Sequence, residues 1–313
     1  MKLNITLDSQ QLYTFGICPL QWYYSYKESI RLATTDQKVA ADKGTLVHYL
    51  MDLYYTERAT KPSESRLLHA SNICQRFLSE KKTLELFPTS DLITDDNFGL
   101  DTFLCDRFML YVHRYLNDDF KPLIVNGKPG IEVGFSKLLY EDDSVRFILE
   151  GRIDLLVDLA GGAWVDHKSE GKYNPLYFYK VQFRTYALAT GYMFGLINYF
   201  GMQEDKDRKL LKANKLFRRD LIAFKPEMIQ EWKQKVLRIF WNVFYGLALP
   251  ENEQEKYFYE LKNESSCSGA FDSHPCQFTH LCEEYNWKFK QEIKEFKYKK
   301  VEPWVPWQIE VTK

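Results

Sequence analysis

The spacing of hydrophobic and polar residues changes twice along the chain. Apolar residues three and four positions apart predict helices, which fall at residues 9–30, 43–57, 65–86, 103–120, 177–194 and 227–249. Alternation of apolar and polar residues predicts strands, which fall at residues 130–139, 145–159, 163–169 and 219–226. The chain therefore begins with helices, continues with a three-strand meander and ends with helices around one more strand.

This order predicts a mixed α/β (α+β) protein, in which helices flank a central mixed sheet and a helical elaboration precedes it. No internal repeat or low-complexity linker interrupts the chain. We therefore expect a single domain, 1–313, with a helical part at 1–125, a sheet core at 126–250 and a C-terminal part at 251–313. The longest uncharged run, 185–203, is broken by glycines and an asparagine, and predicts a buried helix with its exit and not a membrane span.

Composition and charge narrow the classes of protein only slightly. With 313 residues, 45% of them hydrophobic and 16% aromatic, the chain can bury a sizeable core. The net charge of -1 selects no partner, but residues 206–219 carry seven Lys and Arg against one Asp, and residues 286–300 carry six Lys against two Glu. Either segment could follow a phosphate backbone or be an ordinary solvated surface. No stretch resembles a secretion signal, so we expect an intracellular, cytoplasmic protein that is not secreted.

The most informative stretch is residues 149–171, LEGRIDLLVDLAGGAWVDHKSEG, where charged residues interrupt two strand-like apolar runs. Side chains alternate between the two faces of a strand. Asp166 and Lys168 therefore share one face, and His167 lies on the other. Whether Asp154 joins them depends on the turn that links the two runs.

Two turns fit this stretch. A two-residue turn at Gly161-Gly162 would put Asp154 on the face opposite Asp166. A three-residue loop at 160–162, with a glycine in the left-handed region, would pair Asp154 with Lys168 and bring all three charged side chains to one face. We predict the three-residue loop.

Carboxylates that converge at one end of a sheet repel each other, and burial adds to that cost unless a cation lies between them. Oxygen ligands of this kind suit Mg²⁺ or Mn²⁺. Lys168 would then orient or help to deprotonate an attacking water. The alternative is an ordinary amphipathic hairpin, in which Asp154, Asp158 and Asp166 are exposed and Lys168 is their cross-strand partner.

Three short motifs in this region resemble those of the RecB-type branch of the PD-(D/E)XK nuclease superfamily. They are Gly151-Arg152-Ile153-Asp154, then Asp166-His167-Lys168-Ser169, then Gln182 and Tyr186 four residues apart on one helical face. Ile153 replaces the proline that gives the superfamily its name, a departure that is common in this branch. The resemblance implies a restriction-endonuclease-like fold.

The resemblance also implies a role for each residue of these motifs. Asp154 and Asp166 would bind the metal, and Lys168 would assist the attacking water. Gln182 and Tyr186 would lie beside the site on the following helix.

Further matches lie upstream of the hairpin. The segment KGTLVHYLMDLYY resembles the helix that supplies a histidine ligand in these nucleases, which assigns that role to His48, together with the backbone carbonyl of His167. A histidine among leucines and a valine is otherwise an ordinary core residue. Glu132 in GIEVGF matches an acidic position on the preceding strand. The matches together run from about residue 9 to 285.

The six cysteines fall into two groups. An intracellular chain uses cysteines for metal sites or buried thiols more than for disulfides. Cys267, Cys276 and Cys282 form a cluster, and Cys18 lies near the other end of the chain. Four thiolates fit either a [4Fe–4S] cluster or a structural Zn²⁺ ion, and four unrelated buried thiols are the alternative. Cys74 and Cys105 lie on expected helices, and we expect them in the core.

The distribution of one early and three late cysteines is similar to that of AddAB-type nuclease subunits and of CRISPR-associated and mitochondrial-type single-strand exonucleases. In these proteins an iron–sulfur cluster clasps the termini. Their late cysteines usually follow the pattern C-x2-C-x5-C, whereas this chain has C-x8-C-x5-C, which weakens Cys267 as a ligand. His274 and His280 could substitute in a zinc site.

Together these observations predict a metal-dependent DNA nuclease, a single-strand or end-directed exonuclease of DNA processing, repair or recombination. The chain contains no G-x4-G-K-[ST] phosphate loop, so unwinding would need a helicase or recombination partner. Trp22, Tyr23 and Tyr24 could stack on bases or pack around the cysteines. Two rival hypotheses are a non-catalytic DNA-binding or scaffold subunit, and a zinc-stabilised interaction module.

Overall fold

A computed structural model describes residues 2–33, 38–80, 97–170, 173–176, 180–202, 216–267, 276–283 and 287–302. Its longer helices are α1 (Ser9–Ile17), α3 (Lys38–Thr60), α4 (Arg66–Ser79), α6 (Asn97–Arg114), α7 (Val181–Thr190), α9 (Pro226–Ala248), α10 (Glu251–Glu260) and α12 (Trp287–Lys297). Shorter helical turns are α2 (Pro19–Trp22), a π-helical turn (Tyr23–Lys27), a 3-10 turn (Glu264–Ser266) and α11 (Thr279–Glu283).

The strands form one large sheet and two small ones. The ten strands of the described residues are β1 (Leu3–Leu7), β2 (Ile30–Leu32), β3 (Ile124–Val125), β4 (Lys128–Pro129), β5 (Ile131–Glu141), β6 (Val145–Val157), β7 (Ala163–Glu170), β8 (Phe194–Gly201), β9 (Phe217–Ala223) and β10 (Tyr298–Lys300). The large sheet has the order β1-β6-β7-β8-β9, and β5 pairs with the remaining edge of β6. β2 pairs with β10, and β3 pairs with β4.

Local sequence sets several helix ends. The Asp8 side chain accepts a hydrogen bond of 2.7 Å from the Gln11 amide and caps α1. Pro19 and Pro226 occupy the first positions of α2 and α9, where a missing N–H costs nothing. Gly191 ends α7 with a φ of 79°, a conformation that other residues adopt only with strain.

Strand β6 is shared by two neighbours on one edge, and this arrangement forms a fork in the sheet. β1 pairs in parallel with residues 145–149 of β6, whereas β7 pairs antiparallel with residues 155–157. Along its other edge, β6 pairs with β5 from Arg146 to Leu155. Between Leu149 and Leu155, this edge of β6 therefore has no ladder partner among the described strands, and β1 and β7 diverge there.

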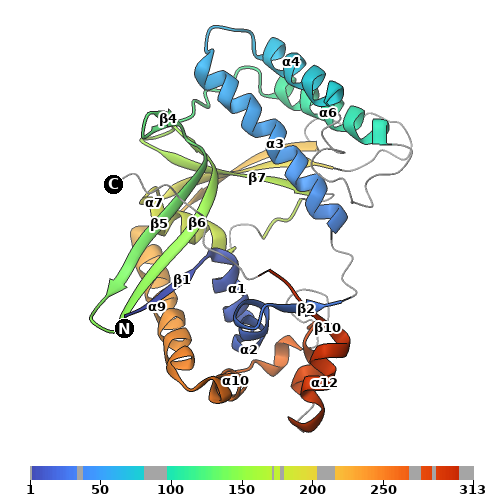
Figure 1. Ribbon diagram of the computed structural model, residues 1–313. Helices are drawn as coiled ribbons and strands as arrows, with labels where there is room; N and C mark the ends of the chain where they lie inside the picture. Colours follow the sequence, from blue (N-terminus) through green and yellow to red (C-terminus); the bar gives the residue numbers. More distant parts are fainter. Residues whose placement is uncertain are drawn as a thin grey trace.

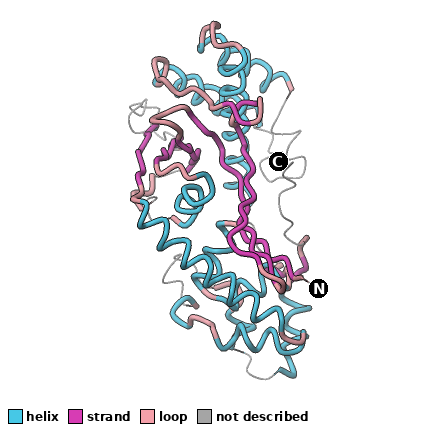
Figure 2. The backbone as a smooth tube through the Cα atoms, turned by 90° about the vertical axis from the view of Figure 1, so that its left-hand side faces the viewer, coloured by secondary structure: helices cyan, strands magenta, loops and turns pink. Residues whose placement is uncertain are grey.

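Two hydrophobic clusters cover the two faces of the sheet. Helices α1, α7 and α9 pack against one face, around Phe147, Trp164 and Phe240. Helices α3, α4 and α6 pack against the other face, around Tyr55, Phe108 and Val165. Figure 1 shows α3, α4 and α6 at one end of the long strands and α10 and α12 at the other, and in Figure 2 the long strands run between the two groups.

The architecture confirms the predicted mixed α/β class with a central mixed sheet flanked by helices. The sequence pattern missed two strands of the large sheet, β1 and β8, and the short strands of the two small sheets. Residues 194–201, expected as the end and exit of a buried helix, form β8 parallel to β7, and the helix before them ends at Thr190. Seven of the eight residues of β8 are buried, so its sequence lacks the alternation that marks a strand with one wet face. None of the described helices meets the length and apolarity that a membrane span requires.

The predicted three-residue loop in the hairpin is wrong. Five residues, 158–162, separate β6 from β7, and Val157 pairs with Ala163. This register places Asp154 opposite Asp166 and not opposite Lys168. Ala160 has a φ of 51° and Gly162 one of 128°, so the turn uses two further left-handed positions beside Gly161.

Candidate active site

The fork in the sheet brings three carboxylates into one row. Ile131 and Val133 of β5 pair with Leu155 and Ile153 of β6, so Glu132 lies opposite Asp154. By the same reasoning, the pairing of Leu155 with Val165 places Asp166 opposite Asp154 on the other side. All three side chains leave neighbouring strands at one level, which is the convergence predicted for the two aspartates.

Asp154 closes the fork with its side chain. Its Oδ2 accepts a hydrogen bond of 2.7 Å from the backbone N–H of His167, a donor that would otherwise belong to the β6–β7 ladder. Burial raises the pKa of Asp154 well above its usual value, and the nearby Asp166 adds to this shift. A negative charge on Asp154 is therefore costly unless a cation joins it.

His48 reaches the row from helix α3, on the opposite layer from α7. The helix can lie close to β7 because Gly44 has no side chain; a Cβ atom there would be 3.3 Å from the Ser169 hydroxyl. His48 Nε2 lies 3.0 Å from the His167 carbonyl oxygen, and His48 Nδ1 lies 3.7 Å from Asp154 Oδ2. A carbonyl can only accept a hydrogen bond, so Nε2 is the protonated nitrogen and Nδ1 keeps its lone pair for a ligand. Burial lowers the pKa of His48, which favours this neutral form.

Asp166 and Lys168 belong to a closed ring of four side chains. Lys168 Nζ lies 2.6 Å from Asp166 Oδ2 and donates to Gln182 Oε1 at 3.1 Å. Gln182 Nε2 donates to the Tyr186 hydroxyl at 2.6 Å, and that hydroxyl donates to Asp166 Oδ1 at 3.3 Å. Burial by itself would lower the pKa of Lys168, but Asp166 and Asp154 outweigh it and raise that pKa. The lysine is therefore an ammonium ion held in one position.

The donor atoms fit a divalent metal ion. One ligand atom each from His48, Glu132 and Asp154 lie within 4.8 Å of one another. Both Glu132 oxygens are buried and accept no hydrogen bond of normal geometry from the described residues, although Arg152 Nε lies 2.5 Å from Oε2. Carboxylate oxygens with one imidazole suit Mg²⁺ or Mn²⁺. The geometry thus adds Glu132 to the expected ligands, while Asp166 is engaged by Lys168.

The sequence motifs did not predict one acidic residue of this site. Asp52 lies one helical turn after His48 on α3, and burial raises its pKa to about 8, with a further contribution from Glu132. Its Oδ1 is buried and, within the part of the chain that the structure describes, accepts no hydrogen bond. The signal was available, because residues i and i+4 share one helical face.

A buried polar network behind His167 was also missed. The His167 ring is fully buried and stacks on Tyr55, and its Nδ1 accepts a hydrogen bond of 2.8 Å from Asn198 Nδ2. Asn198 Oδ1 in turn accepts from Arg219 Nε at 3.1 Å, and Arg219 donates to Asp118 at 2.7 Å. Burial lowers the pKa of His167 far below its usual value. This network fixes the strand whose carbonyl contacts His48.

The structure also brings the four candidate cysteines together. The Cys276 amide donates to the Cys267 carbonyl at 3.2 Å, and Asn263 ties this segment to Ile17, next to Cys18. Burial raises the pKa of Cys276 to about 11 and that of Cys282 to about 12, and the neighbouring thiols add to both shifts.

The four sulfurs do not form a group as tight as the one at the carboxylate row. Among the described residues, no three of them come within 4.8 Å of one another. His280 lines a pocket together with Cys267 and Cys276, whereas His274 lies outside the described residues. Cys74 and Cys105 are buried between α4 and α6, as expected for core residues.

Other candidate contacts to nucleic acid lie elsewhere. Trp22, Tyr23 and Tyr24 are buried in the core, where they pack and cannot stack on bases. Most of the basic segment 206–219 lies outside the described residues. In the second basic segment, the Lys290 side chain is buried against Glu255, so this lysine is internal and not a phosphate contact.

Comparison with known proteins agrees with this geometry. The family model of the PD-(D/E)XK nuclease superfamily matches residues 9–283. Among solved structures, that of SSO0001 matches with 13% identity over 62% of this chain and 86% of its own, at a TM-score of 0.27, too low to support a fold argument. No curated protein matches. Because the family model spans most of the chain and includes the whole carboxylate row, this protein belongs to the PD-(D/E)XK nuclease superfamily.

Proposed function

We propose that the protein is a metal-dependent deoxyribonuclease that degrades single-stranded DNA from a free end. The superfamily implies a metal-dependent nuclease with DNA as its substrate. The observation that carries the proposal is the row of Glu132, Asp154 and Asp166 beside an ammonium ion fixed in place. A site with no catalytic duty would have little reason to bury so many charges.

Each residue of the site has a separate role in this proposal. His48, Glu132 and Asp154 would hold Mg²⁺ or Mn²⁺, with Asp166 and the His167 carbonyl beside them. The bound metal supplies positive charge to the phosphate oxygens as charge develops on them. The Lys168 ammonium, held by Asp166 and Gln182, orients the water that attacks phosphorus. Tyr186 and Gln182 keep that ammonium in place.

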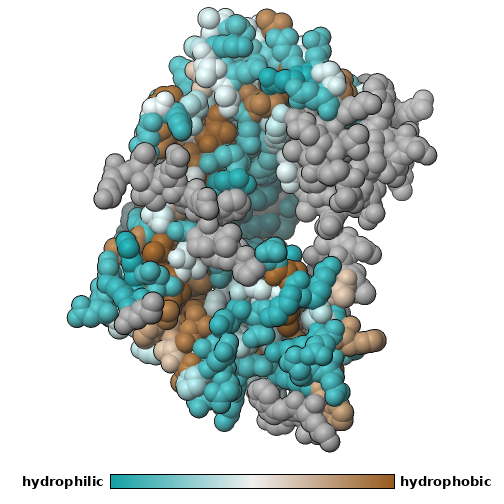
Figure 3. Space-filling model, viewed as in Figure 1, coloured by the Kyte–Doolittle hydropathy of each residue, from teal (hydrophilic) through white to brown (hydrophobic). Residues whose placement is uncertain are grey.

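The depth of the site supports a single strand with a free end. Asp166 is fully buried and Asp154 is 8% exposed, so a phosphate must reach into the fork to meet them. Figure 3 shows the face of Figure 1 hollowed below α3, with mostly hydrophilic visible walls. A flexible single strand can enter such a recess more easily than a rigid duplex can. DNA repair or recombination is the setting that fits this activity.

The cysteines support a second part of the proposal, a [4Fe–4S] cluster on Cys18, Cys267, Cys276 and Cys282. Four thiolates on one Zn²⁺ ion would lie about 3.8 Å apart, because each Zn–S bond is about 2.3 Å long. No three of these sulfurs lie within 4.8 Å of one another among the described residues, which fits a cluster better than a single Zn²⁺ ion. The cluster would join the N-terminal helices to the C-terminal segment.

The nuclease proposal is tested by a degradation time course with end-labelled single-stranded and duplex DNA. Anaerobically purified wild type is compared with Asp166→Asn, with Mg²⁺ or Mn²⁺ present. We expect the wild type to release labelled mononucleotides or short products from single strands, and Asp166→Asn to lose at least about a thousandfold in rate. Asp158→Asn is the matched control, because Asp158 is an exposed aspartate in the turn between β6 and β7.

The same assay separates the rival functions. Internal cuts in circular single strands would show an endonuclease. If the folded wild type binds DNA and cuts no form of it with either metal, the protein is a non-catalytic DNA-binding subunit and the proposal is wrong.

The cluster is tested by visible absorbance and iron content of anaerobically purified protein. We expect about four irons per chain, and a loss of the absorbance in Cys276→Ala. Cys74→Ala should keep it, because Cys74 is buried between two helices away from the cluster site. Zinc in place of iron would reject the cluster.

A further inference from the structure

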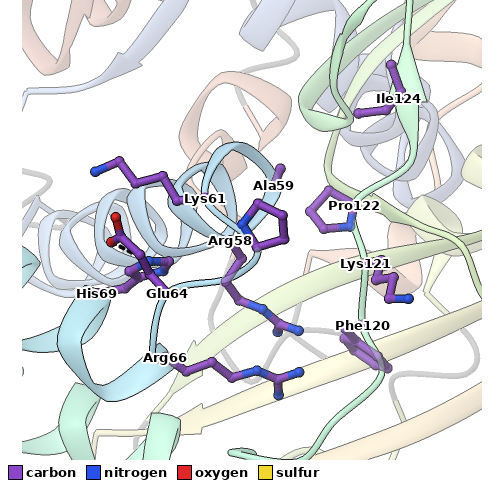
Figure 4. A pocket seen from close by; sticks show the side chains of 11 residues that line it. Arg58, Ala59, Lys61, Glu64, Arg66, His69, Phe120, Lys121, Pro122 and Ile124 are labelled. Carbon is purple, nitrogen blue, oxygen red and sulfur yellow. Dashed lines mark hydrogen bonds and ion pairs between the residues drawn. The ribbon is translucent and has the colours of Figure 1, made fainter.

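A second pocket lies on the surface away from the carboxylate row, at the other end of α3. It has a volume of about 240 Å³ and opens between the turn that joins α3 to α4 and the segment that leads into β3. Figure 4 shows Arg58 and Arg66 on one side of it and Phe120 and Pro122 on the other. Its cations are Arg58, Lys61, Arg66 and Lys121, and its only carboxylate among the described residues is Glu64.

Charge is not balanced beneath this pocket. Three guanidinium groups converge on one carboxylate: Arg58 lies 2.8 Å and Arg66 3.0 Å from Asp118 Oδ1, and Arg219 lies 2.7 Å from Asp118 Oδ2. Within the described part of the chain, no second carboxylate forms an ion pair with any of the three. The side chains of Arg58, Arg219 and Asp118 are at most 10% exposed. Buried charges are normally paired, so this cluster lacks negative charge.

The pocket offers hydrogen-bond donors as well as charge. Arg58 uses one of its five N–H donors on Asp118, and no other hydrogen bond of its guanidinium is found among the described residues. Glu64 accepts a hydrogen bond from His69 Nε2 at 3.0 Å and, among the described residues, pairs with none of the arginines, so cations remain in excess around the pocket. His69 also lines the pocket and is 1% exposed, and its Nε2 is the nitrogen that donates to Glu64. An anion with several acceptor oxygens would satisfy the remaining N–H groups of Arg58.

We propose that this pocket binds a phosphate group, held by Arg58 and Arg66 with Lys121 at its mouth. A guanidinium fork matches the tetrahedral oxygens of phosphate, and such charge-assisted hydrogen bonds are among the strongest in proteins. The donor set selects the phosphate and not what is attached to it. The phosphate can therefore come from a nucleic-acid strand or be free in solution.

The position of the pocket favours the strand. Arg58 follows His48 by ten residues on the same helix, a distance of about 15 Å along its axis. A strand with one phosphate at the carboxylate row could place another phosphate, a few nucleotides away, at Arg58. This choice of source rests on the proposed nuclease function, whereas phosphate binding itself does not.

The test measures binding without metal, so that it is independent of cleavage. In EDTA, equilibrium dialysis with radioactive inorganic phosphate should show one saturable site in the wild type and at least about tenfold weaker binding in Arg58→Gln. Lys121→Glu, a substitution at an exposed position, should weaken binding by a similar factor and guards against a folding defect in Arg58→Gln. Lys256→Gln, on the exposed side of α10, is the matched control and should bind as the wild type does.

The source is identified with a short single-stranded oligonucleotide in which one neutral methylphosphonate linkage is moved along the strand. If the pocket holds a strand phosphate, one linkage position lowers wild-type affinity about tenfold, and Arg58→Gln loses this dependence on position. If phosphate binds in dialysis but no linkage position matters, the ligand is free phosphate. If neither assay distinguishes the wild type from both pocket variants, the proposal is wrong, whatever the result of the cleavage assay.

Discussion

Two buried clusters of charge in this protein are out of balance in opposite senses. At the fork, the four carboxylates of Asp52, Glu132, Asp154 and Asp166 face the cations of Lys168 and Arg152. Beneath the second pocket, three guanidiniums face the single carboxylate of Asp118. The first excess suits a metal cation and the second a phosphate. An unbalanced buried cluster therefore indicates whether the ligand that it binds is a cation or an anion.

In a third buried cluster, the positive and negative charges are paired. Glu255 lies between Lys290 and Lys294, and Lys294 also pairs with Glu28 at 3.5 Å. Burial would raise the pKa of Glu255, but hydrogen bonds from Lys290 and Tyr24 and the charge of Lys294 hold that pKa below its usual value. Nothing in this cluster calls for a ligand, so it serves as the internal reference for the other two.

We expect the largest loss of stability from removal of the single carboxylate of the guanidinium cluster. Asp118→Asn leaves three guanidiniums without a carboxylate and should lower the free energy of unfolding by about 3–5 kcal/mol, as judged from urea denaturation. Asp119→Asn is the control, because Asp119 is exposed and adjacent. Added phosphate should restore part of the loss. Equal stability of both variants would show that the guanidinium cluster does not need its carboxylate.

The balanced cluster should respond to pH. Glu255→Gln should cost about 2 kcal/mol at pH 7, because Lys290 loses its buried carboxylate. The folded-state pKa of Glu255 is lowered, so its contribution is present above the unfolded pKa and is lost as pH falls through the folded one. The difference between the two proteins should therefore vanish in acid. Glu253→Gln, exposed on the same helix, should show no such difference at any pH.

At the fork, removing a carboxylate should raise the free energy of unfolding instead of lowering it. In EDTA, Asp154→Asn should raise the free energy of unfolding by about 1–2 kcal/mol, because it removes one of the carboxylates that repel each other and keeps an acceptor for the His167 amide. Mn²⁺ should stabilise the wild type and not the variant. The measurement is thermal unfolding with and without metal. A variant less stable than the wild type in EDTA would contradict the imbalance.

The last prediction concerns Asp52 and the change of the free energy of unfolding with pH. The Asp52 carboxyl has a pKa of about 8 in the folded protein and an ordinary, lower one when unfolded. Between these values the unfolded chain has lost a proton that the folded protein keeps, so rising pH favours unfolding. Without metal, Asp52→Asn should therefore gain stability over the wild type by about 1.4 kcal/mol for each pH unit between pH 5 and pH 7. At pH 4 the two proteins should unfold at the same urea concentration.

The parts of the site that depend on strand alternation could be predicted from the sequence. Any loop with an odd number of residues between the two strands puts Asp154, Asp166 and Lys168 on one face. The predicted three-residue loop and the observed five-residue turn therefore agree on the face and differ in register. The register depended on Ala160 taking a left-handed conformation, which its residue type does not favour.

Contacts between distant parts of the chain could not be predicted. Arg219 and Asp118 are separated by 101 positions, and no sequence motif predicts a contact between them. Asn198 lies in an apolar run that was assigned to a helix and its exit, so its contact with His167 depended on the missed strand β8. A lone amide in such a run is itself a signal, because a buried polar group requires a partner.

The pairing of β2 with β10 has a consequence for the order of events during synthesis. Leu32 pairs with Tyr298, which the ribosome adds 266 residues later. At a synthesis rate of about 5–20 residues per second, roughly 13–50 s pass between the synthesis of β2 and that of its partner strand. All strands of the large sheet have been made by Ala223, so the sheet can form while the edge of β2 is still open. For that interval the nascent chain presents an unpaired strand, and a chaperone that covers extended segments would find it there.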